Sequence, residues 1–446
     1  MRADRFTDPE TRTRRAESLP GQALRIATVF TAAATAGLAS AMPISAGWFA
    51  SAPRQVDLMI RSVPLAMAAG AIVAVVVAAT VASVNSRRAA WLAITVALLG
   101  ILINHTGLPW LDIDSITTWN YIDSLWAGTI LGSLPVVIWN EPPAVGAYLF
   151  GCVGSRLLGD LTQSAAVTGP VNVIERLIGG APPIWLIAIA LTLLLAYLLL
   201  CEPLTPTPPA PPMYFYSQVV AGLIAVVTIS TVSTWMAHRG ESPLVIAAGI
   251  ALVIAAALTA ALILPDRDGI LLLLIIALTT SCSAVVTVPR PEWTDPAVLA
   301  LAAIGLFTSL RSPKPWIAIA ATATLAAAAT LVALVGGGGG TAIAGVLAVG
   351  FISGYTIGAA VPPRATSAVV AIAILFVPAI SVGLRGRSFG RVSYSPYWYR
   401  LPSIPTQPAP GVAALLITAG CALGILLLTR RPITPQTPTH HTDTLM

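Results

Sequence analysis

Charge is what this sequence has least of. Only 9% of its 446 residues are Asp, Glu, Lys or Arg, and 56% are hydrophobic, whereas an ordinary soluble domain is about 25% charged. Lys314 is the one lysine, so the formal charge of +6 reflects where arginines sit and does not describe a nucleic-acid-binding surface. The composition excludes a soluble protein and argues against a DNA or RNA partner.

Cysteine and histidine are also scarce. The four cysteines lie far apart within or beside apolar runs, and the chain has no CxxC and no Cys/His cluster. Neither a disulfide framework nor a zinc site is indicated. The sequence also lacks the signatures of nucleotide binding, of serine hydrolases and of zinc peptidases. We therefore expect no metal, no cofactor and no enzymatic activity.

Long apolar runs are what the sequence has in abundance. A helix needs about 20 apolar residues to cross the hydrocarbon core of a bilayer, where every backbone polar group must be satisfied within the segment. We predict an all-α, polytopic transmembrane helix bundle of about 14 spans. The runs lie near residues 23–46, 60–84, 89–107, 119–139, 144–163, 183–201, 214–236, 243–264, 269–288, 296–310, 315–335, 341–361, 365–384 and 411–429.

Arginine is distributed unequally between the two sides of this predicted bundle. If the amino terminus is cytoplasmic, short arginine-bearing segments next to helices collect on that side, and positive charge favours the cytoplasm. An even number of spans returns the carboxyl terminus to the same side. We therefore expect a multi-pass protein of the cytoplasmic membrane with both termini inside the cell. The segments are the tail with Arg2–Arg15, then Arg87–Arg88, Arg267, Arg311, Arg364 and Arg430–Arg431.

Three loops differ from the rest in composition. Residues 202–213 are proline-rich, which is typical of an extended linker. Gly336–Gly340 is a pure glycine run that predicts a turn between helices, with a swivel as the alternative. Residues 385–410 hold several tyrosines and Trp398, which favours anchoring at the membrane interface, with a lid over an outward-facing cavity as the alternative.

Charged side chains inside the predicted spans are few and therefore informative. A charge near the bilayer centre costs at least about 2.5–3.5 kcal/mol and usually faces a cavity or a partner. Arg156 and Asp160 are four residues apart, so they share one helix face and can pair. Asp123 lies near the outer end of its span. We predict that these three residues belong to a substrate or proton pathway. Helix–helix pairing of Arg156 with Asp160 and an exposed helix end at Asp123 are the alternatives.

A second acidic feature lies in the loop after the third span. Asp112 and Asp114 form an acidic pair there, and such a pair could bind a metal or act as a base in a membrane glycosyltransferase that uses lipid-linked sugars. This alternative function predicts that both carboxylates are indispensable and that turnover needs no transmembrane gradient.

The segment after the second predicted span carries a recognisable motif. Residues 82–91, "ASVNSRRAAW", resemble the Gly…Asp-Arg-x-Gly-Arg-Arg loop of the major facilitator superfamily, with Arg87 and Arg88 retained. The family's aspartate falls on Ser83 and its glycine on Ser86, so much of the charge latch of the inner gate is missing. The resemblance implies that Arg87 and Arg88 are the remnant of that gate.

Further segments are similar to the fourteen-helix drug:proton antiporters of the same superfamily. Residues 140–160 resemble the inner loop and the glycine-rich antiporter motif of the fifth helix, and residues 179–196 resemble its tryptophan-led sixth helix. Residues 358–371 are similar to the corresponding inner loop of the second half. The resemblance implies two six-helix bundles plus two intervening helices. The expected parts are a cytoplasmic tail 1–22, a bundle 23–201, a linker 202–213, two extra helices 214–264, a bundle 265–429 and a cytoplasmic tail 430–446.

The function that this resemblance implies is secondary transport. We expect proton-coupled efflux of an amphipathic or lipid-like small molecule, as in an antiporter, by alternating access around a midplane site. The expected partners are the lipid bilayer, the small-molecule substrate and protons. A non-transporting membrane scaffold of a cell-envelope pathway is a further alternative, which the missing latch residues favour.

Overall fold

The computed structural model describes residues 19–41, 53–84, 86–106, 116–162, 182–201, 215–240, 242–285, 291, 293–389 and 407–431. Within these ranges, it describes the backbone but not the side chains of residues 19, 41, 53–63, 116, 117, 160–162, 215 and 386–389. All regular secondary structure in the described ranges is α-helical. Eleven segments of it are long and apolar enough to span a membrane, and two shorter apolar helices accompany them. The protein is thus a multi-pass membrane protein.

The helices follow the predicted order of spans. They group as six, two and six when α14 and α15 count as one span, so the predicted bundle of about 14 spans is confirmed. The helices are α1 (Leu19–Ala41), α2 (Pro53–Val84), α3 (Arg87–Thr106), α4 (Ile116–Ile138), α5 (Pro142–Thr162), α7 (Ile184–Leu200), α8 (Phe215–Arg239), α9 (Pro243–Ile263), α10 (Gly269–Ala284), α11 (Thr294–Arg311), α12 (Pro315–Val335), α13 (Gly339–Gly358), α14 (Ala365–Leu375), α15 (Ile380–Phe389) and α16 (Ala409–Thr429).

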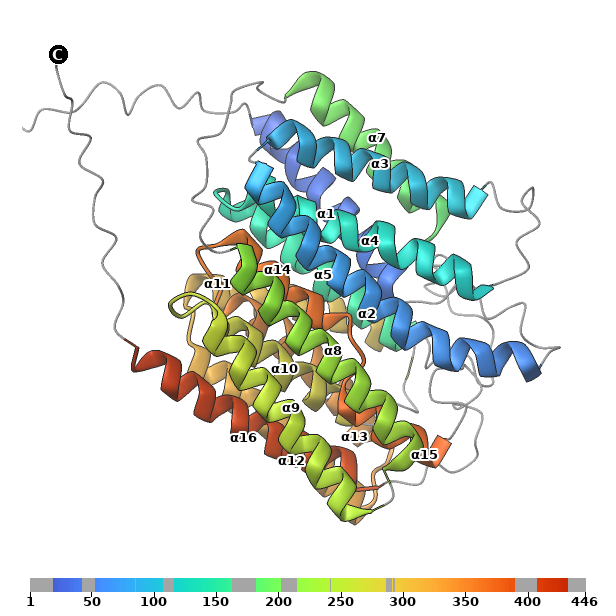
Figure 1. The fold of residues 1–446 in the computed structure, drawn as a ribbon, viewed down its shortest axis with the longest axis vertical. Helices are drawn as coiled ribbons and strands as arrows, with labels where there is room; N and C mark the ends of the chain where they lie inside the picture. The colour runs from blue at the N-terminus through green and yellow to red at the C-terminus, as the bar shows by residue number, and fades with distance from the viewer. Residues whose placement is uncertain are drawn as a thin grey trace, which may run out of the picture.

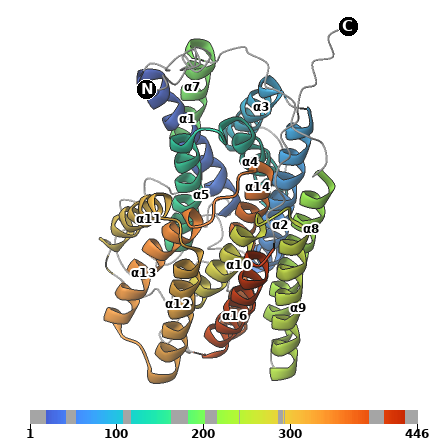
Figure 2. The ribbon, with the colours of Figure 1, turned by 90° about the vertical axis from the view of Figure 1, so that its left-hand side faces the viewer.

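Two helical bundles with the same internal packing make up most of the molecule (Figure 1). In the first bundle, α1 packs on α5 and α7, and α2 packs along α4. In the second, α10 packs on α14 and α16, and α11 packs along α13. The first and fifth helices of each bundle therefore pair, as do the second and fourth. The bundles meet where α5 contacts α11 and α13 and where α14 contacts α2 and α4, and Figure 2 shows α14 between them.

The two intervening helices form a hairpin beside both bundles. Helix α8 contacts α2 of the first bundle and α14 and α15 of the second, whereas α9 packs on α10 and α16. Figure 1 shows α8 along the seam between the bundles. The hairpin thus has one helix at the seam and one on the second bundle.

Glycines set the closest helix pairs. A Cβ atom at Gly128 would lie 2.2 Å from the Gly70 carbonyl oxygen, and one at Gly354 would lie 1.9 Å from the Ala302 carbonyl oxygen. Small residues therefore let α2 approach α4 and α11 approach α13 at backbone contact. Of the glycines of α5, Gly151 approaches α1 in the same way, since its Cβ would lie 2.8 Å from that of Ala33.

The predicted span over residues 365–384 is present, but it consists of two helices and not of one. Helix α14 ends at Leu375, residues 376–379 are not helical, and α15 begins at Ile380. Pro378 lies in this break; proline has no N–H and its ring clashes with the carbonyl four residues earlier, so it interrupts the helix. Residues 367–381 are all buried. The break therefore lies inside the protein, where irregular backbone at membrane depth is tolerated.

The glycine run forms the predicted turn. Helix α12 ends at Val335, and Gly336 adopts φ +87°, a backbone conformation that favours glycine. Gly339 already begins α13, so the turn occupies residues 336–338 and the last two glycines are helical.

Candidate functional site

A pocket lies at the seam between the two bundles. It encloses about 610 Å³ of empty space, including the space at its mouth. Helix α5 supplies its wall from the first bundle, and α10, α13 and α14 supply its walls from the second. The lining residues are Val153, Arg156, Leu157, Leu278, Thr279, Cys282, Ser283, Val346, Val349, Ser353 and Leu375. Most are apolar, and Arg156 carries a full charge.

Arg156 joins the bundles at the break in the α14/α15 span. Its Nε donates a hydrogen bond of 3.0 Å to the Leu375 carbonyl oxygen. This carbonyl ends α14 and has lost its helical partner because the helix stops there. The Ala379 carbonyl oxygen on the other side of the break accepts a hydrogen bond of 2.9 Å from Ser233 Oγ of α8. The Leu375 carbonyl that the break leaves free is thus satisfied by a side chain from α5, and a side chain from α8 bonds to the backbone where α15 begins.

The hydroxyl and thiol groups of the pocket face one another across α10 and α13. Cys282 Sγ lies 3.6 Å from Ser353 Oγ, and Thr279 Oγ1 donates to the Ile276 carbonyl oxygen of its own helix at 3.2 Å. These groups give the second-bundle wall a polar strip between apolar residues.

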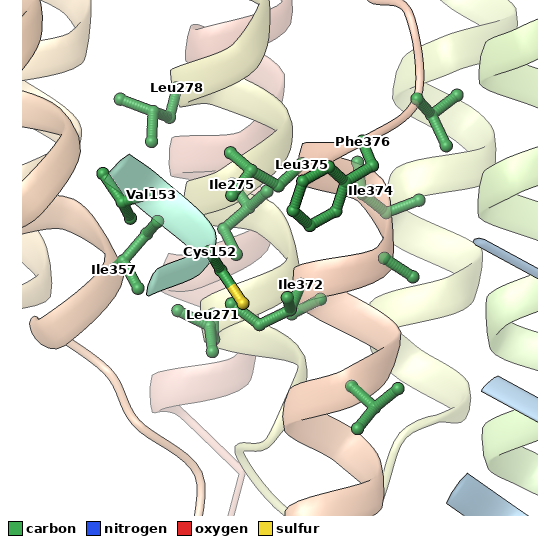
Figure 3. Close-up of a cluster of buried hydrophobic side chains, with 14 of the residues drawn as sticks. Cys152, Val153, Leu271, Ile275, Leu278, Ile357, Ile372, Ile374, Leu375 and Phe376 are labelled. Atoms are coloured by element: carbon green, nitrogen blue, oxygen red, sulfur yellow. The ribbon is translucent and has the colours of Figure 1, made fainter. Parts of the chain in front are cut away.

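A buried apolar layer closes the pocket on one side. One helical turn before Arg156, Cys152 packs against side chains of α10, α13 and α14 (Figure 3). Each helix passes from this layer into the pocket wall, since α10 contributes Ile275 to the layer and Leu278 to the pocket. The layer is buried to 0–1% exposure, so it separates the pocket from the helix ends beyond it. Its members include Cys152, Leu271, Ile275, Ile357, Ile372 and Phe376.

The helix ends beyond this layer form what we call the basic end, the end of the bundle that carries Arg25, Arg87, Arg364 and Arg431. In the first bundle, Arg25 of α1 donates a hydrogen bond of 2.6 Å to Glu141 Oε1 in the α4–α5 loop. Arg87 at the start of α3 donates a hydrogen bond of 3.1 Å to the Val137 carbonyl oxygen, and its guanidinium lies 4.0 Å from the same Glu141 oxygen. The predicted gate residue Arg87 therefore sits in an ion cluster centred on Glu141.

The second bundle has its own ion cluster at the basic end. Arg364, which precedes α14, donates to Asp266 Oδ2 at 2.8 Å and to Asp268 Oδ2 at 3.0 Å. Burial raises the pKa of the Asp268 carboxyl, although hydrogen bonds from Ser367 and Arg364 act against this rise. Burial alone would lower the pKa of Arg364, but the two carboxylates outweigh it and the pKa is raised. The guanidinium therefore stays charged.

A neutral hydrogen bond joins the bundles at the basic end. Trp139 Nε1 at the end of α4 donates 2.9 Å to the Pro362 carbonyl oxygen in the loop before α14. The two proline-containing loops that resemble each other in sequence, at Pro142–Pro143 and at Pro362–Pro363, are thus brought together.

Asp123 lies away from the pocket in a polar cluster between α3 and α4. Its carboxylate is 1% exposed, so the alternative of an exposed helix end is wrong. Asp123 Oδ1 accepts a hydrogen bond of 2.6 Å from Asn104 Nδ2, and Asp123 Oδ2 lies 2.8 Å from His105 Nε2.

The predicted site residues thus fall into separate places. Arg156 lines the pocket, whereas Asp123 does not, and Arg88 is exposed at the start of α3. The side chain of Asp160 and the pair Asp112 and Asp114 lie outside the described residues, so the Arg156–Asp160 pairing stays a prediction. Sequence reasoning did not identify Arg25, Glu141, His105 and the cluster of Arg364 with Asp266 and Asp268. An isolated acid beside the double proline at 142–143 was the available signal for Glu141.

Comparisons with known proteins identify the fold. No family model and no curated protein sequence matches the chain. Among solved structures, the POT family transporter PepTSo aligns with a TM-score of 0.50 and 12% identity over 92% of this chain and 96% of that chain. An auto-inhibited POT family peptide transporter aligns with a TM-score of 0.49 and 14% identity over 94% and 99% of the two chains. The chain therefore shares the fold of PepTSo, and this fold is a bundle of transmembrane helices as the sequence predicts.

Proposed function

We propose that this protein is a membrane secondary transporter that moves a small amphipathic molecule by alternating access. The observation that carries the proposal is the pocket between the bundles, which lies beside a broken helix and is closed on one side by the Cys152 layer. Transporters bind substrate near the midplane, at discontinuous helices between two halves that rock around the site. The likeness to PepTSo supports the fold that this mechanism requires.

The amphipathic character of the substrate follows from the pocket wall. Apolar side chains such as Val153, Leu278 and Val349 line most of it, and Arg156 and the hydroxyls of Thr279 and Ser353 form polar points. Pockets of this kind bind ligands by apolar burial and orient them through few polar groups.

Export and proton coupling are the finer parts of the proposal, and they rest on the sequence resemblance to drug:proton antiporters. Asp123 is the first candidate proton carrier, because its carboxylate is buried within a span and contacts His105 Nε2 at 2.8 Å. Asp160 is the second candidate proton carrier. PepTSo is a POT family transporter, so the antiporter assignment draws no support from the likeness to it.

Distance measurements between two spin labels on the full chain in nanodiscs test alternating access without a known substrate. One label at Arg88 and one at Lys314 mark the two bundles at the basic end, and both positions are exposed. We expect two distance populations, one with the basic end closed and one with it open. A control pair at Arg88 and Leu200 lies within the first bundle and should give one distance. One unchanging distance for the first pair under all conditions would refute the transporter proposal.

The same labels test proton coupling. If Asp123 or Asp160 binds the coupling proton, the ratio of the two populations depends on pH in the wild type, and Asp123→Asn or Asp160→Asn removes that dependence. A pH-independent ratio in the wild type would contradict proton coupling while leaving alternating access intact.

A further inference from the structure

We propose that the turn between α11 and α12 binds an anionic phospholipid. Arg311 and Lys314 contact the phosphate of its headgroup, and exposed apolar side chains beside the turn contact its acyl chains. The inference goes beyond the proposed function, because it concerns the lipid-facing surface of the protein and does not depend on what the pocket takes up.

The turn lies at the level of the lipid headgroups. Helices α11 and α12 are both long and apolar enough to span a membrane, so residues 312–314 between them lie at the membrane surface. A Cβ atom at Gly146, near the start of α5, would lie 3.6 Å from Leu310, which places this turn at the basic end with the α4–α5 loop. Residues 311–314 are all exposed. Their side chains can therefore reach the phosphates of the leaflet at the basic end.

An aromatic ring positions the cation at the end of α11. The guanidinium carbon of Arg311 lies 4.1 Å from the centroid of the Phe307 ring, one helical turn earlier. A guanidinium stacked on a ring keeps its N–H donors at its edge, and their geometry matches two oxygens of one phosphate. Lys314 adds a second positive charge at the same turn. The two cations together suit a headgroup with a net negative charge.

Apolar side chains lie beside these cations on both helices. Phe307 of α11 is 56% exposed, and Trp316 and Ile317 in the first turn of α12 are 47% and 49% exposed. Helix α11 packs on α13 and α5, and α12 packs on α16 and α10, so these exposed side chains lie on the lipid-facing surface. Tryptophan is typical of the membrane interface. A phospholipid thus meets positive charge at its phosphate and apolar surface along its chains.

Other cations of the basic end are placed differently. The arginines of the two ion clusters bond to carboxylates, and Arg267 and Arg431 donate to carbonyl oxygens at helix ends. Those guanidiniums stabilise contacts within the protein, whereas the neighbour of Arg311 is an exposed ring at the lipid-facing surface.

Native mass spectrometry of the full chain in a neutral detergent tests the inference. Dioleoyl phosphatidylglycerol and dioleoyl phosphatidylcholine carry the same acyl chains and differ in net charge. A cation near the membrane surface contributes about five-fold to the affinity for anionic lipid, so we expect the wild type to bind the first phosphatidylglycerol about ten-fold or more tightly than the first phosphatidylcholine. The double variant Arg311→Gln with Lys314→Gln should lose this preference and keep its affinity for phosphatidylcholine.

A charge-matched control separates a site from a general attraction. Arg88→Gln with Arg430→Gln removes the same charge from two exposed positions elsewhere at the basic end and should keep the preference. Arg311→Lys with Lys314→Arg, which preserves both charges, should keep it as well. Equal losses in the two glutamine double variants would overturn the inference, because the attraction would then belong to the whole basic end. Equal affinities of the wild type for the two lipids would overturn it too.

Discussion

The hydrogen bond from Trp139 to the Pro362 carbonyl oxygen holds the two bundles together at the basic end, and its removal should shift the protein toward the open state. The bond is 2.9 Å long, and its partners lie in the turn after α4 and in the loop before α14. The Trp139→Phe variant keeps an aromatic ring at this position and removes the indole N–H. The bond exists with the basic end closed, so its loss destabilises the closed state relative to the open one.

The size of the shift follows from the energy of one such bond. A neutral hydrogen bond contributes about 0.5–1.5 kcal/mol net, because the separated partners can bond to water. This range corresponds to a change of about two- to twelve-fold in the ratio of open to closed molecules. Trp139 is half-buried in the closed state, so water can reach its partner after opening and the lower part of the range applies.

Spin-label distances between Arg88 and Lys314 measure this ratio directly. The matched control is Glu141→Gln, which weakens a contact inside the first bundle, between Glu141 and Arg25, and should change the ratio less than Trp139→Phe does. An unchanged ratio in Trp139→Phe, or a shift toward the closed state, would refute the idea that this contact holds the basic end closed.

Three further predictions concern stability. Glu141→Gln replaces the carboxylate that lies 2.6 Å from the guanidinium of Arg25, which is 12% exposed, by a neutral amide, so we expect a loss of about 2 kcal/mol, measured as a lower melting temperature. Gly354→Val should abolish folding, because even a Cβ atom there would lie 1.9 Å from the Ala302 carbonyl oxygen, whereas Gly146→Ala, whose Cβ would lie 3.6 Å from Leu310, should fold; chromatographic yield decides. The raised pKa of Asp268 means that this group contributes stability fully below its unfolded pKa of 3.8 and loses that contribution as pH rises through the folded pKa. The melting temperature of the wild type relative to Asp268→Asn should therefore fall as the pH rises above 3.8, and a constant difference would contradict the assigned shift.

The length and order of the spans could be predicted from the sequence because hydropathy reports which segments enter lipid. Hydropathy does not report whether such a segment is one helix. Residues 365–384 are as apolar at the break as on either side of it, and Pro378 is the one local sign of interruption. Its effect depends on Arg156, which satisfies the Leu375 carbonyl that the break leaves free, and Ser233 adds a bond to the Ala379 carbonyl where α15 begins.

The site could be predicted only in part, because its contacts join distant residues. Arg156 was identifiable from the cost of a charge inside a span, and its bond to Leu375 crosses 219 positions of the chain. Arg25 and Glu141 are 116 residues apart, and nothing local pairs them. The burial of Asp123 depends on Asn104 and His105 of the neighbouring helix, so its own segment is compatible with an exposed helix end.

The ion clusters at the basic end occupy corresponding places in the two bundles with opposite charges. The first bundle has a cation, Arg25, in its first helix and an anion, Glu141, after its fourth. The second has an anion, Asp268, before its first helix and a cation, Arg364, after its fourth. Each of these ion pairs lies within one bundle, so the bundles can separate there while the pairs stay compensated. Breaking a buried ion pair leaves an uncompensated charge and costs about 3–5 kcal/mol, more than a rocking motion near equilibrium tolerates. The bond from Trp139 to Pro362 joins the two bundles and is neutral. Breaking it costs less free energy than breaking a buried ion pair, which suits a protein that alternates between two states.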